Sequence, residues 1–210
     1  MRLGFLVFNG VEELDLTGPW ELVGELKKRG KITDAFMISP TMERLTCAKQ
    51  MQLVPHHSYE NCPSFDVLIV PGGEGRRREV DNPETIQFIK DKASKCQAVL
   101  SVCTGAFLLE KAGLLENVKA TTHWSAIEEL RALGVTVVED RFINNGPIWT
   151  SAGVSAGIDM ILAFIAEKLG PETAGEAQLY AEYFPDGTVY GEPWQKPEVS
   201  QYIKSLSAQS

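Results

Sequence analysis

Short apolar runs alternate with amphipathic segments along most of this chain. Residues 3–8, 65–70 and 98–102 are apolar almost throughout, which is typical of strands that are buried on both faces of a sheet. Residues 35–39 and 135–138 predict two further strands, and residues 120–123 a shorter one. Two hairpins are also expected, one within residues 45–54 and one around Asn145-Gly146, a pair that favours tight turns.

Helix signals lie between the predicted strands. Asn82, Pro83 and Glu84 have the order of a helix cap, a first-turn proline and a first-turn acid, so we expect a helix from there to about residue 95. A second helix is expected to begin after a cap at Thr17 or Gly18 and to end at Gly30. Further helices are expected at residues 125–133, where Ser125 and Glu128 match a capping box, and at residues 158–169 and 172–183.

This alternation of strands and helices predicts an α/β fold. Helices that connect parallel strands cover both faces of the sheet, so we expect a three-layer sandwich around a mainly parallel sheet. At 210 residues the chain is expected to form one domain, spanning residues 1–210. Ligands of such sheets bind at the carboxyl ends of the strands, which directs attention to the residues at those ends.

Composition narrows the classes of function. The formal net charge is −8, and the one basic run is Arg76-Arg77-Arg78, so no nucleic-acid partner is expected. Four cysteines lack the spacing of a zinc site, and no metal is expected. The N-terminal apolar run is shorter than a signal peptide requires, and no run has membrane-spanning length. We therefore expect a cytoplasmic protein with reduced thiols and no membrane partner.

Cys103 is the candidate nucleophile. An apolar strand ends abruptly at this residue, and a helix-forming segment follows, which is the outline of a nucleophile elbow. An elbow requires small residues two positions before and after the nucleophile, and Ser101 and Gly105 meet that requirement. The N-terminal end of a helix would favour a thiolate. The alternative is that Cys103 is a small buried residue without a role.

Two other strand ends carry candidate chemistry. Gly72 and Gly73 directly follow a strand, and their N–H groups could approach an anion closely; a plain glycine turn is the alternative. Asp15 follows the first strand and is expected in the loop that leaves it. A loop aspartate is commonly a solvated or capping residue, so the sequence alone leaves its role open.

These residues resemble the DJ-1/PfpI superfamily, whose fold is flavodoxin-like and whose reactive cysteine lies on an elbow. Five blocks carry the resemblance and are similar to those of isocyanide hydratases within that superfamily. The blocks are Leu14-Asp15-Leu16-Thr17-Gly18-Pro19, Val70-Pro71-Gly72-Gly73, Ser101-Val102-Cys103-Thr104-Gly105, Ala120-Thr121-Thr122-His123-Trp124 and Ala156-Gly157-Ile158-Asp159.

The resemblance implies a lyase that acts on a small molecule without a cofactor. Cys103 would attack the terminal carbon of an isocyanide, and water would release the formamide from a thioimidate. Asp15 would be the general acid and base, and Thr104 would orient substrate or water. The N–H groups of Thr104 and Gly73 would stabilise negative charge. Relatives are dimers, so a homodimer is also implied.

Departures from related branches leave alternatives open. Glutamine amidotransferases use a distant His-x-Glu, whereas His123 is followed by Trp124-Ser125. The peptidase-like branch has histidine directly after the nucleophile, where this chain has Thr104. His123 could serve as a base or could be structural. A redox-sensing protective protein with an oxidisable cysteine, or another hydrolase or glyoxalase-type activity, is the competing interpretation.

Overall fold

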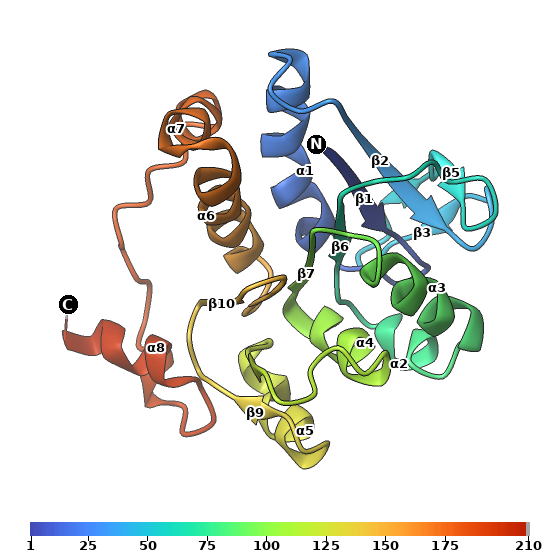
Figure 1. The fold of residues 1–210 in the computed structure, drawn as a ribbon. Helices are drawn as coiled ribbons and strands as arrows, with labels where there is room; N and C mark the ends of the chain where they lie inside the picture. The colour runs from blue at the N-terminus through green and yellow to red at the C-terminus, as the bar shows by residue number, and fades with distance from the viewer. Residues whose placement is uncertain (209–210) are drawn as a thin grey trace.

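A computed structural model describes residues 1–208. Its main sheet has the strand order β10-β11-β7-β6-β1-β2-β5, and every neighbouring pair is parallel except the antiparallel β10–β11 hairpin (Figure 1). The predicted mainly parallel sheet is therefore confirmed. In the order of the sheet, its strands are β10 (Phe142–Asn145), β11 (Ile148–Ser151), β7 (Ala98–Val102), β6 (Val67–Val70), β1 (Arg2–Leu6), β2 (Asp34–Ser39) and β5 (His57–Ser58).

Helices cover both faces of this sheet. One hydrophobic cluster joins one face to α1 (Glu13–Lys28), α6 (Ala156–Leu169) and α7 (Pro171–Tyr180). A second cluster joins the other face to α3 (Pro83–Ala93), α4 (Ala106–Lys111) and α5 (Ile127–Ala132), next to the short helix α2 (Arg76–Glu79). Strands β6 and β7 are buried along their whole length, as their continuous apolar runs predict. The three-layer expectation is confirmed.

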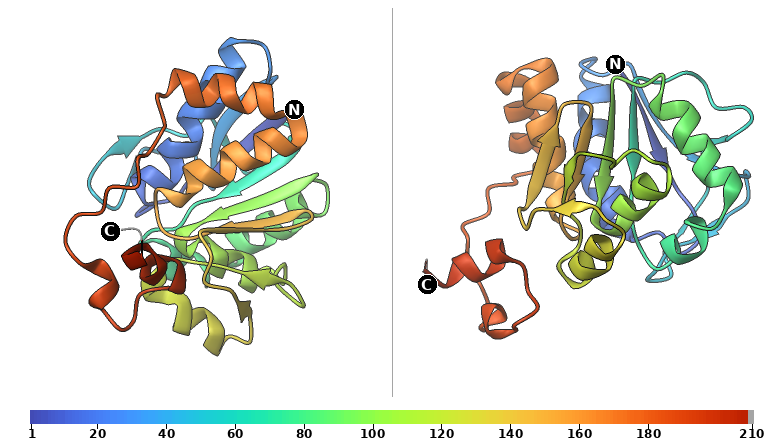
Figure 2. Two further views of the ribbon diagram at one scale, coloured as in Figure 1. Left: turned by 90° about the vertical axis from the view of Figure 1, so that its left-hand side faces the viewer. Right: turned by 60° about the horizontal axis from the view of Figure 1, so that its bottom comes forward.

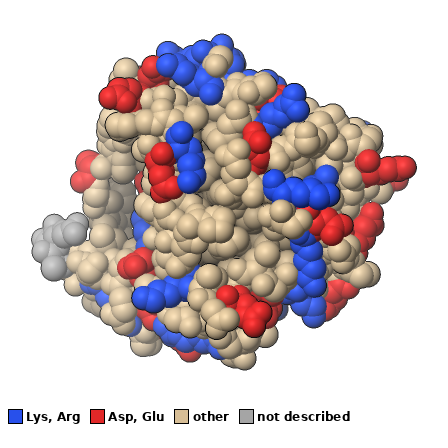
Figure 3. Space-filling view, in the orientation of Figure 1, with Lys and Arg blue, Asp and Glu red and all other residues tan. Residues whose placement is uncertain are grey.

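Two small sheets lie beside the main one. Strands β3 (Leu45–Thr46) and β4 (Gln52–Leu53) form the expected accessory hairpin. Strands β8 (Lys119–Ala120) and β9 (Thr136–Val137) pair in parallel. On the face of the molecule drawn in Figure 3, acidic and basic side chains are interspersed.

Helix α1 begins five or six residues before the position that the sequence predicts, since its cap position is Glu12 and not Thr17 or Gly18. It starts at Glu13 and includes Pro19, so Asp15 lies in its first turn rather than in a loop. Pro19 is the seventh residue of α1 and lies inside the helix, where a proline removes one i→i−4 hydrogen bond. Glu13 and Asp15 place acidic side chains in the first turn, where they favour the helix.

The predicted capping box at Ser125 is wrong, because no side chain caps the start of α5. Residues 124–126 form a separate short helical turn before α5, and the side chain of His123 caps that turn by accepting the Ser125 N–H. The hydroxyl of Ser125 instead contacts the His123 ring at 2.8 Å. A histidine nitrogen has therefore taken the role that the sequence pattern gives to serine.

The C-terminal segment returns to the body of the molecule near α5. After α7 it runs along the outside of the molecule (Figure 2) to a short turn (Pro193–Gln195), α8 (Gln201–Lys204) and a last turn (Ser205–Ala208). Val199 and Ser200 are buried where it docks. Within the part of the chain described, no helix combines the length and apolar character needed to cross a membrane.

Candidate active site

The turn after β7 holds Cys103 in a backbone conformation that favours glycine. Its φ is +56°, in the left-handed region. The Cys103 N–H donates to the Ala152 carbonyl over 3.0 Å, and the Cys103 carbonyl accepts from the Thr122 hydroxyl over 2.9 Å. Bonds from two neighbouring segments thus hold the strained residue in place.

The small residues of the predicted elbow have a packing reason. A Cβ at Gly105 would lie 2.1 Å from the Val70 carbonyl oxygen, so the turn passes the end of β6 with no space for a side chain. Ser101 is fully buried within β7. Both observations support the elbow that the sequence predicts at Cys103.

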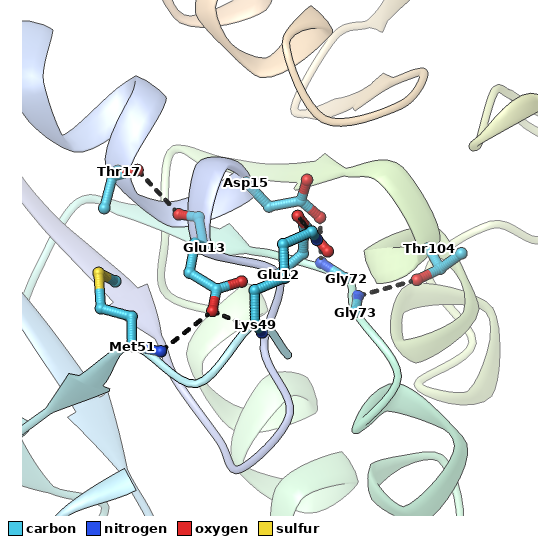
Figure 4. Close-up of polar contacts among 9 residues, drawn as sticks. All are labelled: Glu12, Glu13, Asp15, Thr17, Lys49, Met51, Gly72, Gly73 and Thr104. Atoms are coloured by element: carbon cyan, nitrogen blue, oxygen red, sulfur yellow. Dashed lines mark hydrogen bonds and ion pairs between the residues drawn. The ribbon is translucent and has the colours of Figure 1, made fainter. Parts of the chain in front are cut away.

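Asp15 is fully buried beside the elbow. Its Oδ2 accepts the Gly72 N–H at 2.8 Å (Figure 4). Its Oδ1 is also buried and accepts no hydrogen bond of full geometry, whereas the Cys103 thiol interacts with the carboxyl group. The first turn of α1 and the elbow therefore bring a carboxyl group and a thiol together in a dry environment.

Burial dominates the titration of both groups. It raises the pKa of Asp15 from an ordinary 3.8 to about 7, and the Glu12 charge adds to this while the Gly72 N–H opposes it. It raises the pKa of Cys103 from 9.0 to about 12, and the Asp15 charge adds to this. Burial of Cys103 therefore opposes the thiolate form that the helix end favours. Because adjacent buried anions repel, the pair keeps a proton at neutral pH.

Two backbone N–H groups partly offset this by favouring the thiolate form of Cys103. They belong to Val154 and Thr104, and each lowers the pKa of the thiol. Val154 lies in the loop between β11 and α6 and has a φ of +43°, which is rare for a β-branched residue. The sequence analysis gave Val154 no role. Its one sequence signal is its place just after Gly153, in a loop that leaves a strand at the same edge of the sheet.

The N–H groups of Gly72 and Gly73 are occupied by side chains of the site. Gly72 donates to Asp15, and Gly73 donates to Thr104 Oγ1 at 3.1 Å (Figure 4). A Cβ at Gly72 would lie 2.4 Å from the same hydroxyl oxygen. These glycines hold Asp15 and Thr104 in place, which differs from the open oxyanion pocket that the sequence suggests.

His123 lies at one side of the site. Its Nδ1 contacts the Ser125 hydroxyl at 2.8 Å and accepts the Ser125 N–H at 3.3 Å. The other side of the ring packs on Gly153, where a Cβ would lie 2.4 Å from His123 Cδ2. Burial lowers the pKa of His123. These contacts place His123 next to the loop that carries Val154.

Cys103 is 6% exposed, so the thiol lies below the surface. A cavity of about 470 Å³ lies between Trp124 and the docked C-terminal segment at Pro197 and Val199, and neither Cys103 nor His123 lines it. Among the described residues, no three His, Cys, Asp or Glu side chains gather as a metal site. The residues gathered at the elbow supply a thiol, a carboxyl group, a hydroxyl group and two backbone donors.

Comparison with known sequences places this arrangement among related proteins. The sequence model of the DJ-1/PfpI family matches residues 1–167. An isonitrile hydratase from Pseudomonas putida is 37% identical over 185 residues, which cover 88% of this chain and 79% of that protein.

Solved structures share the fold. A ThiJ/PfpI family protein from Pseudomonas syringae is 29% identical, with a TM-score of 0.85 over 99% of this chain and 84% of that one. DJ-1 from Schizosaccharomyces pombe is 18% identical, with a TM-score of 0.74 over 88% of this chain and 100% of that one. The flavodoxin-like architecture of such neighbours agrees with the sheet and helix layers described above.

Proposed function

Because this chain belongs to the DJ-1/PfpI family, we propose that it is an isocyanide hydratase. Such a lyase adds water to an isocyanide, R–N≡C, and releases the N-substituted formamide, R–NH–CHO. The observation that carries the proposal is the buried contact between the Asp15 carboxyl group and the Cys103 thiol. The similarity to isonitrile hydratase supports the same substrate class.

In the first half of the proposed reaction, the Cys103 sulfur forms a bond to the terminal carbon of the isocyanide. The thiol proton passes through Asp15 to that carbon, which accepts both a nucleophile and a proton. The product is a thioimidate, R–N=CH–S–Cys103, and no proton is gained or lost overall. Asp15 Oδ1 suits this transfer because the Gly72 N–H holds only Oδ2.

In the second half, water adds to the thioimidate carbon. Asp15 takes one proton from the water and passes it to the nitrogen, which gives R–NH–CH(OH)–S–Cys103. The C–S bond then breaks, the hydroxyl proton passes to the sulfur, and the formamide leaves. No oxidation state changes in either half, so the proposed reaction requires no redox cofactor.

Thr104 and Val154 assist these steps. The Thr104 Oγ1 accepts the Gly73 N–H, which directs its own O–H toward other acceptors, and we assign it the orientation of substrate or water. The Thr104 and Val154 N–H groups lower the pKa of Cys103 and so stabilise the charge that develops on the departing sulfur. Both donors are fixed by the backbone before the substrate arrives.

The test measures formamide by chromatography for the wild type, Cys103→Ser and a blank without enzyme, over a panel of small alkyl and aryl isocyanides. The wild type should form formamide with no added metal, nucleotide or flavin. Cys103→Ser should be inactive, because a serine hydroxyl is too weak an acid for Asp15 to ionise. Equal product from the wild type and the serine variant would overturn the proposal.

A further inference from the structure

The tip of the β3–β4 hairpin brings a lysine to the edge of the site. Lys49 Nζ forms an ion pair with the Glu12 carboxylate (Figure 4). Glu12 directly precedes α1, and its N–H donates to the Gly72 carbonyl at 3.0 Å. The N–H of the same Gly72 holds Asp15. The carbonyl group of Gly72 therefore holds the backbone of Glu12, and its N–H group holds the side chain of Asp15.

The backbone fixes the hairpin against the start of α1. The Lys49 N–H donates to Glu13 Oε1 at 2.6 Å, and the Ala48 N–H donates to the Val11 carbonyl at 2.8 Å. The Thr46 N–H donates to the Asn9 side chain at 2.9 Å. The position of Lys49 near Glu12 therefore follows from the fold of the hairpin and not only from the reach of a flexible side chain.

Titratable groups from three elements face Asp15. They are Glu12 before α1, Cys103 at the elbow and Lys49 on the hairpin, in addition to the Gly72 N–H. Glu12 raises the pKa of Asp15 and Lys49 lowers it. Glu12 and Asp15 both raise the pKa of Cys103. Within the ion pair, the Glu12 charge therefore favours retention of the proton that Asp15 and Cys103 share, and the Lys49 charge opposes it.

We propose that the Glu12–Lys49 ion pair controls how firmly the Asp15–Cys103 pair holds its proton, as two positioning residues that stand outside the reacting atoms. The proposal deepens the proposed function and rests on it wherever turnover is concerned. The Glu12 side chain is 16% exposed and that of Lys49 is 68% exposed. Salt should therefore screen the effect of the lysine more than that of the glutamate.

The test uses Glu12→Gln, Lys49→Gln, the double variant and Glu13→Gln as a matched control. Glu13→Gln removes the same charge one residue away, from a side chain that points to the hairpin (Figure 4). The readout is the rate of Cys103 alkylation by iodoacetamide against pH, which requires no isocyanide. Fragment-ion mass spectrometry is needed because Cys96 and Cys103 share one tryptic peptide between Lys95 and Lys111.

Glu12→Gln should lower the midpoint of alkylation by roughly half a pH unit or more, because removal of a nearby anion makes loss of the proton easier. Lys49→Gln should raise the midpoint by less, and high salt should abolish this shift. The double variant should fall between the two single variants, and Glu13→Gln should shift less than Glu12→Gln. The pH profile of turnover should move in the same directions.

Unchanged midpoints in both single variants, or equal shifts in Glu12→Gln and Glu13→Gln, would overturn this proposal. If Glu12→Gln fails to fold, Lys49→Gln alone decides, because its side chain is exposed. Shifted midpoints in a protein that forms no formamide would reject the proposed function and keep the role of the ion pair. Formamide turnover with unchanged midpoints would support the proposed function and reject the role of the ion pair.

Discussion

The first turn of α1 supplies a carboxyl group to each of two buried cysteines. At the elbow, Asp15 faces Cys103; at the β3–β4 hairpin, Glu13 lies near Cys47. The two thiols are alike in burial, at 6% and 2% exposed. They are also alike in acidity, because burial and a nearby carboxyl group raise the pKa of Cys103 to about 12 and that of Cys47 to about 11.

The two regions differ in what their polar groups are free to do. Glu13 Oε1 accepts the N–H groups of Lys49 and Met51 at 2.6 and 3.4 Å, so it fastens the hairpin to the helix. Asp15 keeps Oδ1 clear of backbone donors, and Cys103 has a strained φ and two N–H groups that favour its thiolate. Burial and a raised pKa alone therefore do not distinguish the two thiols; backbone strain and preorganised donors do.

The largest expected effect concerns stability against pH. Asp15 has a folded-state pKa of about 7 against an ordinary 3.8, so its contribution is fully present below pH 3.8 and is lost as pH rises through 7. About 4 kcal/mol of unfolding free energy should be lost between pH 4 and pH 8 through this group. Urea unfolding of the wild type and Asp15→Asn should show a steeper fall for the wild type. Parallel curves would contradict the prediction.

Turnover of an isocyanide should separate the two carboxyl groups. Asp15→Asn should slow formamide formation by about a hundredfold, because the amide keeps the size of the side chain but cannot carry a proton. Glu13→Gln should stay within about twofold of the wild type, because it acts on the hairpin. Similar losses in both variants, measured as kcat by chromatography, would remove the distinction between the regions.

The smallest effect concerns backbone strain. Cys103→Gly should relieve the positive φ, which costs roughly 1 kcal/mol or more in a residue other than glycine. Cys47 does not have a positive φ, so Cys47→Gly relieves no strain. This substitution should lower the free energy of unfolding through lost packing. In thermal unfolding experiments, the free energy of unfolding of Cys103→Gly should therefore exceed that of Cys47→Gly by about 1–2 kcal/mol. Equal costs would mean that the elbow stores no strain.

Local sequence signals were sufficient for the elbow and the accessory hairpin. Small residues around Cys103 and the break from an apolar strand to a helix depend on neighbours in sequence, so the pattern contains them. The same holds for the Asn82 cap, which accepts the Glu84 N–H at 3.1 Å. The fold class followed from the order of such segments.

Contacts between distant segments were not available from the sequence. The Val154 N–H reaches Cys103 only because β11 pairs with β7, and Gly72 and Gly73 donate to side chains that arrive from other loops. The early start of α1 was hidden by Pro19, which reads as a first-turn residue. A histidine cap at His123 competes with the more common serine pattern and was missed for that reason.

The position of β11 has a consequence for how the protein is made. Strand β7 pairs with β6 on one side and with β11 on the other, and β11 is separated from β7 by about a fifth of the chain. A nascent chain that ends after α4 already contains Asp15 and Cys103, but it lacks the Ala152 carbonyl and the Val154 N–H that hold the elbow. Because contacts of long sequence separation form slowly, we expect the elbow to be completed, and the thiol to acquire its final surroundings, only when β11 pairs with β7.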